Sequence, residues 1–160
     1  MSSLRTALIA FAALTFAGGL AYADDEVNVS VGGTLAGKPL ALHGYDPVAY
    51  FTEGKPVLGE PRFAAVFEGA TYYFSSAAHQ KLFEGTPSKY APQYGGFCAF
   101  GAALGKKFDG NPAVFLVRDG KLYLNLAPDI AAKFGEDVAG NIQKADARWP
   151  EIRAKRAASL

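Results

Sequence analysis

Two apolar runs separated by Asp119-Gly120 constrain the fold of this chain more than any other segment. The first run spans residues 113–118 and the second spans residues 121–126. Asp-Gly is favoured in two-residue hairpin loops, because both of its residues tolerate a positive φ. The pattern therefore predicts an antiparallel β-hairpin here, with Asp119 serving the turn.

Further short strands and helices are expected on both sides of this hairpin. Alternating or short apolar and aromatic runs predict strands at 27–32, 40–42, 62–67 and 71–74. Start and stop signals predict helices at 77–83, 97–104, 128–134 and 138–149. Ser75 or Ser76 is expected to cap the first of these helices, and Pro150 to end the last one. Because strands and helices occur as separate short pieces rather than as repeated βαβ units, the sequence predicts an α+β fold.

The first 23 residues have the three parts of a cleavable signal peptide. Arg5 gives a basic start, an apolar stretch follows at 7–20, and Ala21-Tyr22-Ala23 supplies small residues for cleavage. The apolar stretch is short for a membrane span, which needs about 20 residues. We therefore expect export to a bacterial periplasm, one mature domain over 24–160, and no stable membrane insertion after cleavage.

The charge balance argues against two classes of partner. The chain has 16 Lys and Arg against 15 Asp and Glu, and Arg5 belongs to the expected signal peptide. The mature domain is therefore neutral, without a basic field for nucleic acid or a polybasic patch for an anionic membrane. A metal ion or a small molecule is the expected partner.

Several motifs occur together in one order. Residues 44–90 contain Asp46-Pro47-Val48, Tyr72-Tyr73-Phe74-Ser75-Ser76, His79, Phe83, Pro87 and Tyr90, and longer motifs lie at 44–51, 89–99, 119–125 and 145–150. In these motifs the chain resembles the YHS domain family, and more closely its exported branch. The resemblance covers nearly all of the mature chain. It implies a small core of β-hairpin and helix over about 44–90, extended by further short strands and C-terminal helices.

The same resemblance weakens an inherited metal site. Metal-binding YHS domains carry cysteines at three positions, which correspond here to Ala49, Ser75 and His79. Two of the three ligand positions are thus lost, and the third, His79, is a weaker candidate. A structural zinc site needs about four nitrogen or sulfur ligands, which these positions do not supply. Some members of the exported branch carry selenocysteine at the position of Cys98. That resemblance implies redox or soft-metal chemistry at Cys98.

Cys98 is the only cysteine, so an internal disulfide is impossible. In an oxidising compartment a lone thiol is buried and inert, is retained for chemistry, or pairs with another chain. Cys98 follows Gly95-Gly96 at the start of an expected helix, where backbone amides lower a thiol's pKa. We therefore predict Cys98 as the catalytic or metal-binding residue, with a thiol that is reachable from solvent.

The two histidines are the candidate partners of Cys98. Imidazole is a good ligand for copper or zinc, so Cys98, His79 and His43 would form a soft to borderline metal site if they met in space. Tyr45 and Asp46 are candidates for lining a cofactor pocket, although Asp46 also fits a turn residue that bonds its own backbone.

Three hypotheses follow from these residues. The first is a periplasmic binding protein of the YHS class that holds copper or a small ligand near Cys98. The second is a thiol-dependent redox protein that uses Cys98. The third is a structural or interaction module in which Cys98 is packed.

Overall fold

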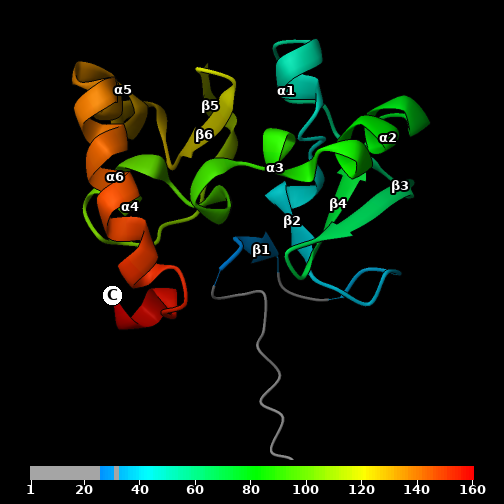
Figure 1. Ribbon diagram of the computed structural model, residues 1–160, viewed down its shortest axis with the longest axis horizontal. Coiled ribbons are helices and arrows are strands. Elements are labelled where there is room, and N and C mark those ends of the chain that lie inside the picture. Colours follow the sequence, from blue (N-terminus) through cyan, green and yellow to red (C-terminus); the bar gives the residue numbers. More distant parts are fainter. Residues whose placement is uncertain (1–25, 31–32) are drawn as a thin grey trace, which may run out of the picture.

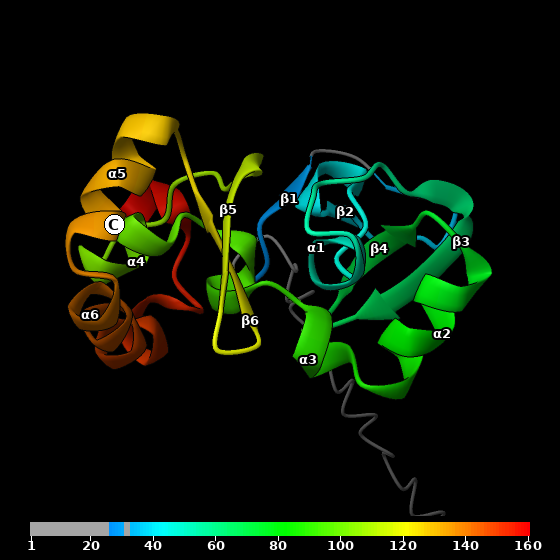
Figure 2. The same cartoon turned by 90° about the horizontal axis from the view of Figure 1, so that it is seen from above.

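The computed structural model describes residues 26–30 and 33–160. The expected signal peptide, residues 1–23, lies outside the described residues, as do residues 31–32 of the first expected strand. Figures 1 and 2 show two groups of elements side by side. We call residues 26–90 the N-terminal half and residues 91–160 the C-terminal half. Within the described residues, no helix is long and apolar enough to cross a membrane.

The N-terminal half is built on a small sheet with the strand order β1-β2-β4-β3. Its strands are β1 (Val29–Ser30), β2 (Leu40–Ala41), β3 (Glu60–Phe67) and β4 (Ala70–Phe74). Its helices are η1 (Leu42–Gly44), α1 (Ala49–Thr52), α2 (Ala77–Gly85) and α3 (Pro87–Tyr90). The pair β3–β4 is the expected hairpin, and β2 runs parallel to β4.

The C-terminal half surrounds the second hairpin with helices. Its elements are η2 (Gln93–Gly96), α4 (Ala99–Ala103), β5 (Asn111–Arg118), β6 (Lys121–Asn125), α5 (Pro128–Glu136), α6 (Val138–Ile152) and η3 (Ala157–Ser159). The strands β5 and β6 are antiparallel, and Asp119 and Gly120 have φ of 52° and 71° at their turn. This conformation is the one that the Asp-Gly pair predicted.

Strand β6 joins the two halves, because its side chains alternate between two hydrophobic cores. Leu122 and Leu124 are buried in the core of the N-terminal half. Tyr123 lies between them in sequence and is buried in the core of the C-terminal half, beside Phe134. Successive side chains of a strand point to opposite faces, so a single strand can serve both cores.

The α+β fold is confirmed, and the predicted elements occur with shifted boundaries. Ser76 caps α2 by accepting a hydrogen bond from the backbone N–H of His79 at 3.2 Å, as predicted. Helix α6, however, continues through Pro150 to Ile152, so the prediction that it stops before Pro150 is wrong. Pro150 lies in the last turn, where it removes one backbone donor, and the next turn is closed by the bond from Arg153 N to Trp149 O at 2.8 Å.

Candidate functional site

Asp46 is fully buried and organises the polar contacts between α1 and α2. Its Oδ1 accepts a hydrogen bond from the backbone N–H of Val48 at 2.8 Å. Its Oδ2 accepts from the backbone N–H and the hydroxyl of Ser75, at 2.8 and 2.7 Å. His79 Nδ1 also lies 2.6 Å from Oδ2, which makes Nδ1 the protonated nitrogen that donates to the carboxylate.

His79 connects this carboxylate to α1. Its Nε2 lies 3.2 Å from Thr52 Oγ1, and its side chain is 15% exposed. Ala49 N lies 3.4 Å from Asp46 Oδ1, so positions 49, 75 and 79 do meet around one point. The feature at that point is the carboxylate of Asp46 rather than a set of three metal ligands. The bonds from Val48 and Ala49 confirm the alternative of a turn residue that bonds its own backbone. The bonds from Ser75 and His79 extend that role to α2.

Tyr45, the other candidate for lining a pocket, packs against the core of the N-terminal half. Its backbone forms an isolated antiparallel bridge with Leu58. Tyr45 and Asp46 are therefore neighbours in a packed turn, and neither lines the cleft described below.

His43 lies in a second polar cluster, which connects the two halves. Its Nε2 is 2.8 Å from Asp109 Oδ1. The Nδ2 group of Asn28 donates to the same carboxylate oxygen at 2.7 Å and to the carbonyl of Gly96 at 3.2 Å. His43 has a φ of 50°, which is unusual for a residue other than glycine. The contacts of this cluster hold His43 against the loop around Asp109.

Cys98 is fully buried, so the expectation of a thiol reachable from solvent is wrong. The residue is the N-cap of α4, and its Sγ accepts a hydrogen bond from Gly101 N at 3.4 Å. The thiol also lies within hydrogen-bonding distance of Asn125 Oδ1, at 3.6 Å. Its backbone N–H donates to Phe108 O at 2.9 Å. The thiol therefore has polar partners inside the protein and no open face for a substrate.

The predicted metal site of Cys98, His79 and His43 is not assembled. Across residues 26–30 and 33–160, no group of three or more His, Cys, Asp and Glu side chains is placed to hold a metal ion. The physical reason is that each histidine faces a different carboxylate, Asp46 or Asp109, while Cys98 bonds to Asn125. Copper and zinc consequently lack a common set of donors in this arrangement.

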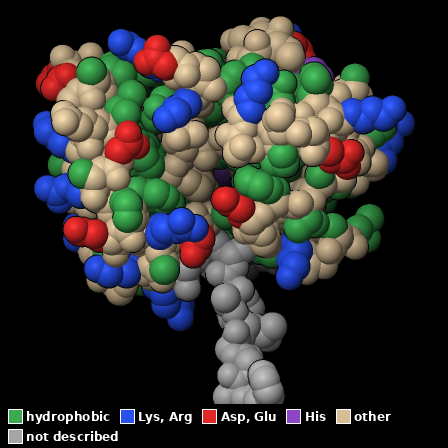
Figure 3. Space-filling view, viewed as in Figure 1, with side chains coloured by type: hydrophobic (Ala, Val, Ile, Leu, Met, Phe, Trp, Pro, Cys, Tyr) green, Lys and Arg blue, Asp and Glu red, His purple; other side chains and the backbone are tan. Residues whose placement is uncertain are grey.

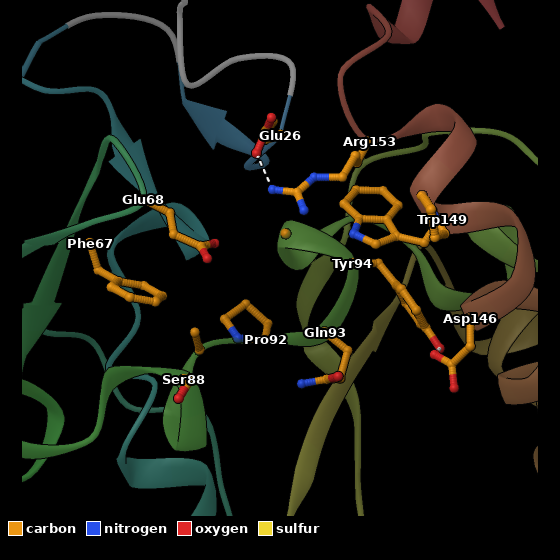
Figure 4. Close-up of a pocket in the computed structure, with 13 residues that line it drawn as sticks. Glu26, Phe67, Glu68, Ser88, Pro92, Gln93, Tyr94, Asp146, Trp149 and Arg153 are labelled. Atoms are coloured by element: carbon orange, nitrogen blue, oxygen red, sulfur yellow. Dashed lines mark hydrogen bonds and ion pairs between the residues drawn. The ribbon is translucent and has the colours of Figure 1, made fainter.

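A cleft of about 360 Å³ lies between the two halves. Figure 4 shows Phe67, at the end of β3, and Glu68, in the β3–β4 turn, on one side of it, and side chains of α6 on the other. Thirteen residues line the cleft: Glu26, Phe67, Glu68, Ser88, Ala91, Pro92, Gln93, Tyr94, Gly95, Asp146, Trp149, Pro150 and Arg153. Pockets for small molecules are of this size and combine aromatic surface with a few polar groups.

One wall of the cleft is aromatic and held in place by hydrogen bonds. The rings of Tyr94 and Trp149 are 5.8 Å apart, and Tyr94 Oη donates to Asp146 Oδ1 at 2.9 Å. Burial, and then the hydrogen bond to Asp146, raise the pKa of the Tyr94 hydroxyl well above 10.0. Lys107 Nζ lies 5.4 Å from the centre of the Trp149 ring and donates to the carbonyl of Arg153 at 2.6 Å. These contacts fix the wall before any ligand arrives.

The cleft is acidic. Arg153 forms an ion pair with Glu26 at 2.5 Å, so these two charges compensate each other. Asp146 accepts from the neutral Tyr94 hydroxyl, and Glu68 has no hydrogen-bond or ion-pair partner within the described part of the chain. Over the whole face drawn in Figure 3, by contrast, acidic and basic side chains are interspersed. The lining of the cleft therefore carries three carboxylates and one guanidinium, an excess of negative charge.

Sequence reasoning missed the cleft, although a signal for it was present. The motifs at 89–99 and 145–150, which carry the resemblance to the exported YHS branch, meet at its aromatic wall through Tyr94 and Trp149. In the sequence alone, aromatic residues such as these are explained by packing in the core. Tyr94 is indeed 5% exposed, but it also borders the cleft.

Comparison with known proteins yields no relative: no family model, no curated protein and no solved structure matches this chain. Its function is therefore inferred from its own residues and their geometry.

Proposed function

We propose that this protein is an exported binding protein of the YHS class that holds a small organic molecule in the cleft between its halves. The observation that carries this proposal is the aromatic wall of Tyr94 and Trp149, which is fixed by the hydrogen bond to Asp146 and borders open volume. A preformed wall costs little ordering on binding, which favours affinity for a small ligand. Export to the periplasm and membership of the YHS class remain part of the proposal, supported by residues 1–23 and by the motifs between 44 and 150.

This proposal keeps the small-ligand part of the first hypothesis and moves the ligand away from Cys98. The buried sulfur supports neither direct metal binding nor thiol chemistry, since the thiolate must be accessible for both. A purely structural role would leave the acidic cleft without an explanation. We therefore place the ligand beside Trp149 rather than beside the thiol.

The single tryptophan makes the proposal directly testable. In a ¹H–¹⁵N NMR spectrum of the labelled protein, Trp149 gives one indole N–H signal that needs no assignment. We would titrate a set of neutral, anionic and cationic organic fragments. At least one fragment is expected to shift this signal in a saturable way, because the indole borders the cleft.

Two matched variants separate the cleft from the rest of the surface. Ser88→Phe adds a ring at an exposed position that lines the cleft and should weaken fragment binding at least tenfold. Ala78→Phe adds the same ring at an exposed position of α2 outside the cleft and should leave binding unchanged. Absence of any saturable shift at millimolar fragment concentrations would overturn the proposal, as would binding that Ser88→Phe does not weaken.

A further inference from the structure

We infer that the ligand of the cleft is a small organic cation, an ammonium or amidinium group attached to a compact apolar body; this inference rests on the proposed function. The first reason is the charge of the lining. Arg153 is the only cationic residue among the described residues that line the cleft, and its guanidinium is already paired with Glu26. Arg153 also interacts electrostatically with Glu68, but one guanidinium among three carboxylates leaves the lining negative, which disfavours an anionic ligand.

The second reason is the position of the carboxylate that has no partner. Figure 4 shows the side chain of Glu68 extending from the β3–β4 turn toward the cleft, with Tyr94 and Trp149 on the opposite side. Glu68 has a φ of 48° and Gly69 a φ of 77°, so the tight turn fixes the backbone from which this side chain extends. A cation in the cleft would pair with Glu68, and its apolar body would lie against the aromatic wall.

The third reason is that the aromatic wall itself suits a positive charge. Faces of tryptophan and tyrosine rings carry negative potential and attract ammonium or guanidinium groups within about 6 Å of the ring centre. Lys107 Nζ already makes such a contact, 5.4 Å from the ring centre of Trp149 and 5.1 Å from that of Phe97. We therefore place the ligand's charge at Glu68 and its apolar body against the rings. The carboxylate on one side and the rings on the other therefore suit a ligand with a cationic group and an apolar body.

The carboxylates do not suit a metal ion. They belong to separate walls, Glu68 to the β3–β4 turn and Asp146 to α6, and the described residues contain no group of three or more acidic, histidine or cysteine ligands. Calcium needs six or more oxygen ligands at about 2.3–2.6 Å. The volume of about 360 Å³ lies at the small end of the range for small-molecule pockets, which suits a compact organic cation.

Three probes of nearly equal shape test the charge preference. Benzylammonium is cationic, benzyl alcohol is neutral and benzoate is anionic at pH 7. We would titrate each into the full protein and follow the indole N–H signal of Trp149. Benzylammonium is expected to bind at least fivefold more tightly than benzyl alcohol, to bind less tightly when NaCl is raised, and to bind far more tightly than benzoate.

Charge-neutral variants assign the preference to particular residues. Glu68→Gln should weaken benzylammonium binding about two- to fivefold, the range for an exposed ion pair, and should leave benzyl alcohol binding unchanged. Asp146→Asn keeps an oxygen that accepts from Tyr94 and should have an effect of similar size. Glu53→Gln removes one charge outside the cleft lining and serves as the control.

The outcomes separate this inference from the proposed function. Equal binding of all three probes, or tighter binding of benzoate, would overturn the inference while leaving the proposed function intact. Failure of all three probes to move the indole signal would also overturn the inference, and the wider fragment set would then decide the proposed function separately. Equal losses in Glu68→Gln and Glu53→Gln would show that net charge, rather than the cleft, attracts the cation.

Discussion

Replacement of Asp46 by alanine should destabilise the protein more than replacement of any exposed carboxylate. Asp46 is fully buried and accepts five hydrogen bonds, from the backbone N–H groups of Val48, Ala49 and Ser75, from the Ser75 hydroxyl and from His79 Nδ1. Alanine removes all five acceptor contacts and leaves the donors in place. The variant therefore exposes the energetic role of one carboxylate.

The magnitude follows from which donors can find new partners. The amides of Val48 and Ser75 bond to Asp46 at 2.8 Å, and leaving such a group unsatisfied costs about 1–3 kcal/mol. His79 is partly exposed and can turn to water, so its loss and that of the Ser75 hydroxyl cost about 0.5–1.5 kcal/mol each. These contributions total about 3–9 kcal/mol if no donor relaxes. We expect the lower part of that range, about 3–5 kcal/mol, which is the loss found when one partner of a buried pair is removed.

Urea unfolding followed by circular dichroism measures this loss. With a slope of about 2 kcal/mol/M, the midpoint should fall by about 2 M while the slope itself stays constant. Asp129→Ala is the control, because Asp129 is exposed in the first turn of α5 and its interaction with the helix dipole is worth less than about 1 kcal/mol. A loss below about 1 kcal/mol for Asp46→Ala would refute the reasoning from buried donors.

Three further predictions use other parts of the chain. In the native protein the Cys98 thiol should react with dithionitrobenzoate only as fast as the protein locally unfolds around it, and it should react fully in urea. Rapid stoichiometric reaction without urea would contradict the burial of this thiol. Burial raises the pKa values of Tyr50, Tyr72 and Tyr94 above 10.0. Their contribution to the free energy of unfolding is therefore fully present below about pH 10 and should be lost as the pH rises further. Tyr94→Phe should make this loss less steep, and an unchanged pH profile would argue against a shifted pKa of Tyr94. Protein from the periplasmic fraction should begin at Asp24 by intact mass, whereas a retained Met1 in that fraction would exclude the expected cleavage.

The elements that the sequence predicted well are those determined by neighbouring residues. The Asp119-Gly120 hairpin depends on two positive φ values at adjacent positions. The start of α2 depends on Ser76 and the amide three residues later. Such contacts lie within a few residues of one another, so their chemistry can be read directly along the chain.

The burial of Cys98 and the cleft could not be read in this way. Cys98 is enclosed by contacts with Phe108 and Asn125, which are distant enough in sequence that only the folded chain brings them together. The cleft joins Glu26, Glu68 and Trp149 from three separate segments. Local patterns identify which residues are aromatic or charged, but the pairing of segments decides whether they face a cavity or a core.

The geometry of the cleft depends on β6, although no residue of β6 lines it. Phe67, on one wall, packs against the core that contains Leu122 and Leu124. Tyr94, on the other wall, belongs to the core that contains Tyr123, with their ring centres 6.0 Å apart. Because consecutive residues of one short strand anchor both cores, the two walls cannot separate without breaking the packing of that strand. A fixed distance between the walls is the property that a preformed binding cleft requires, and here a hairpin specified by Asp119-Gly120 supplies it.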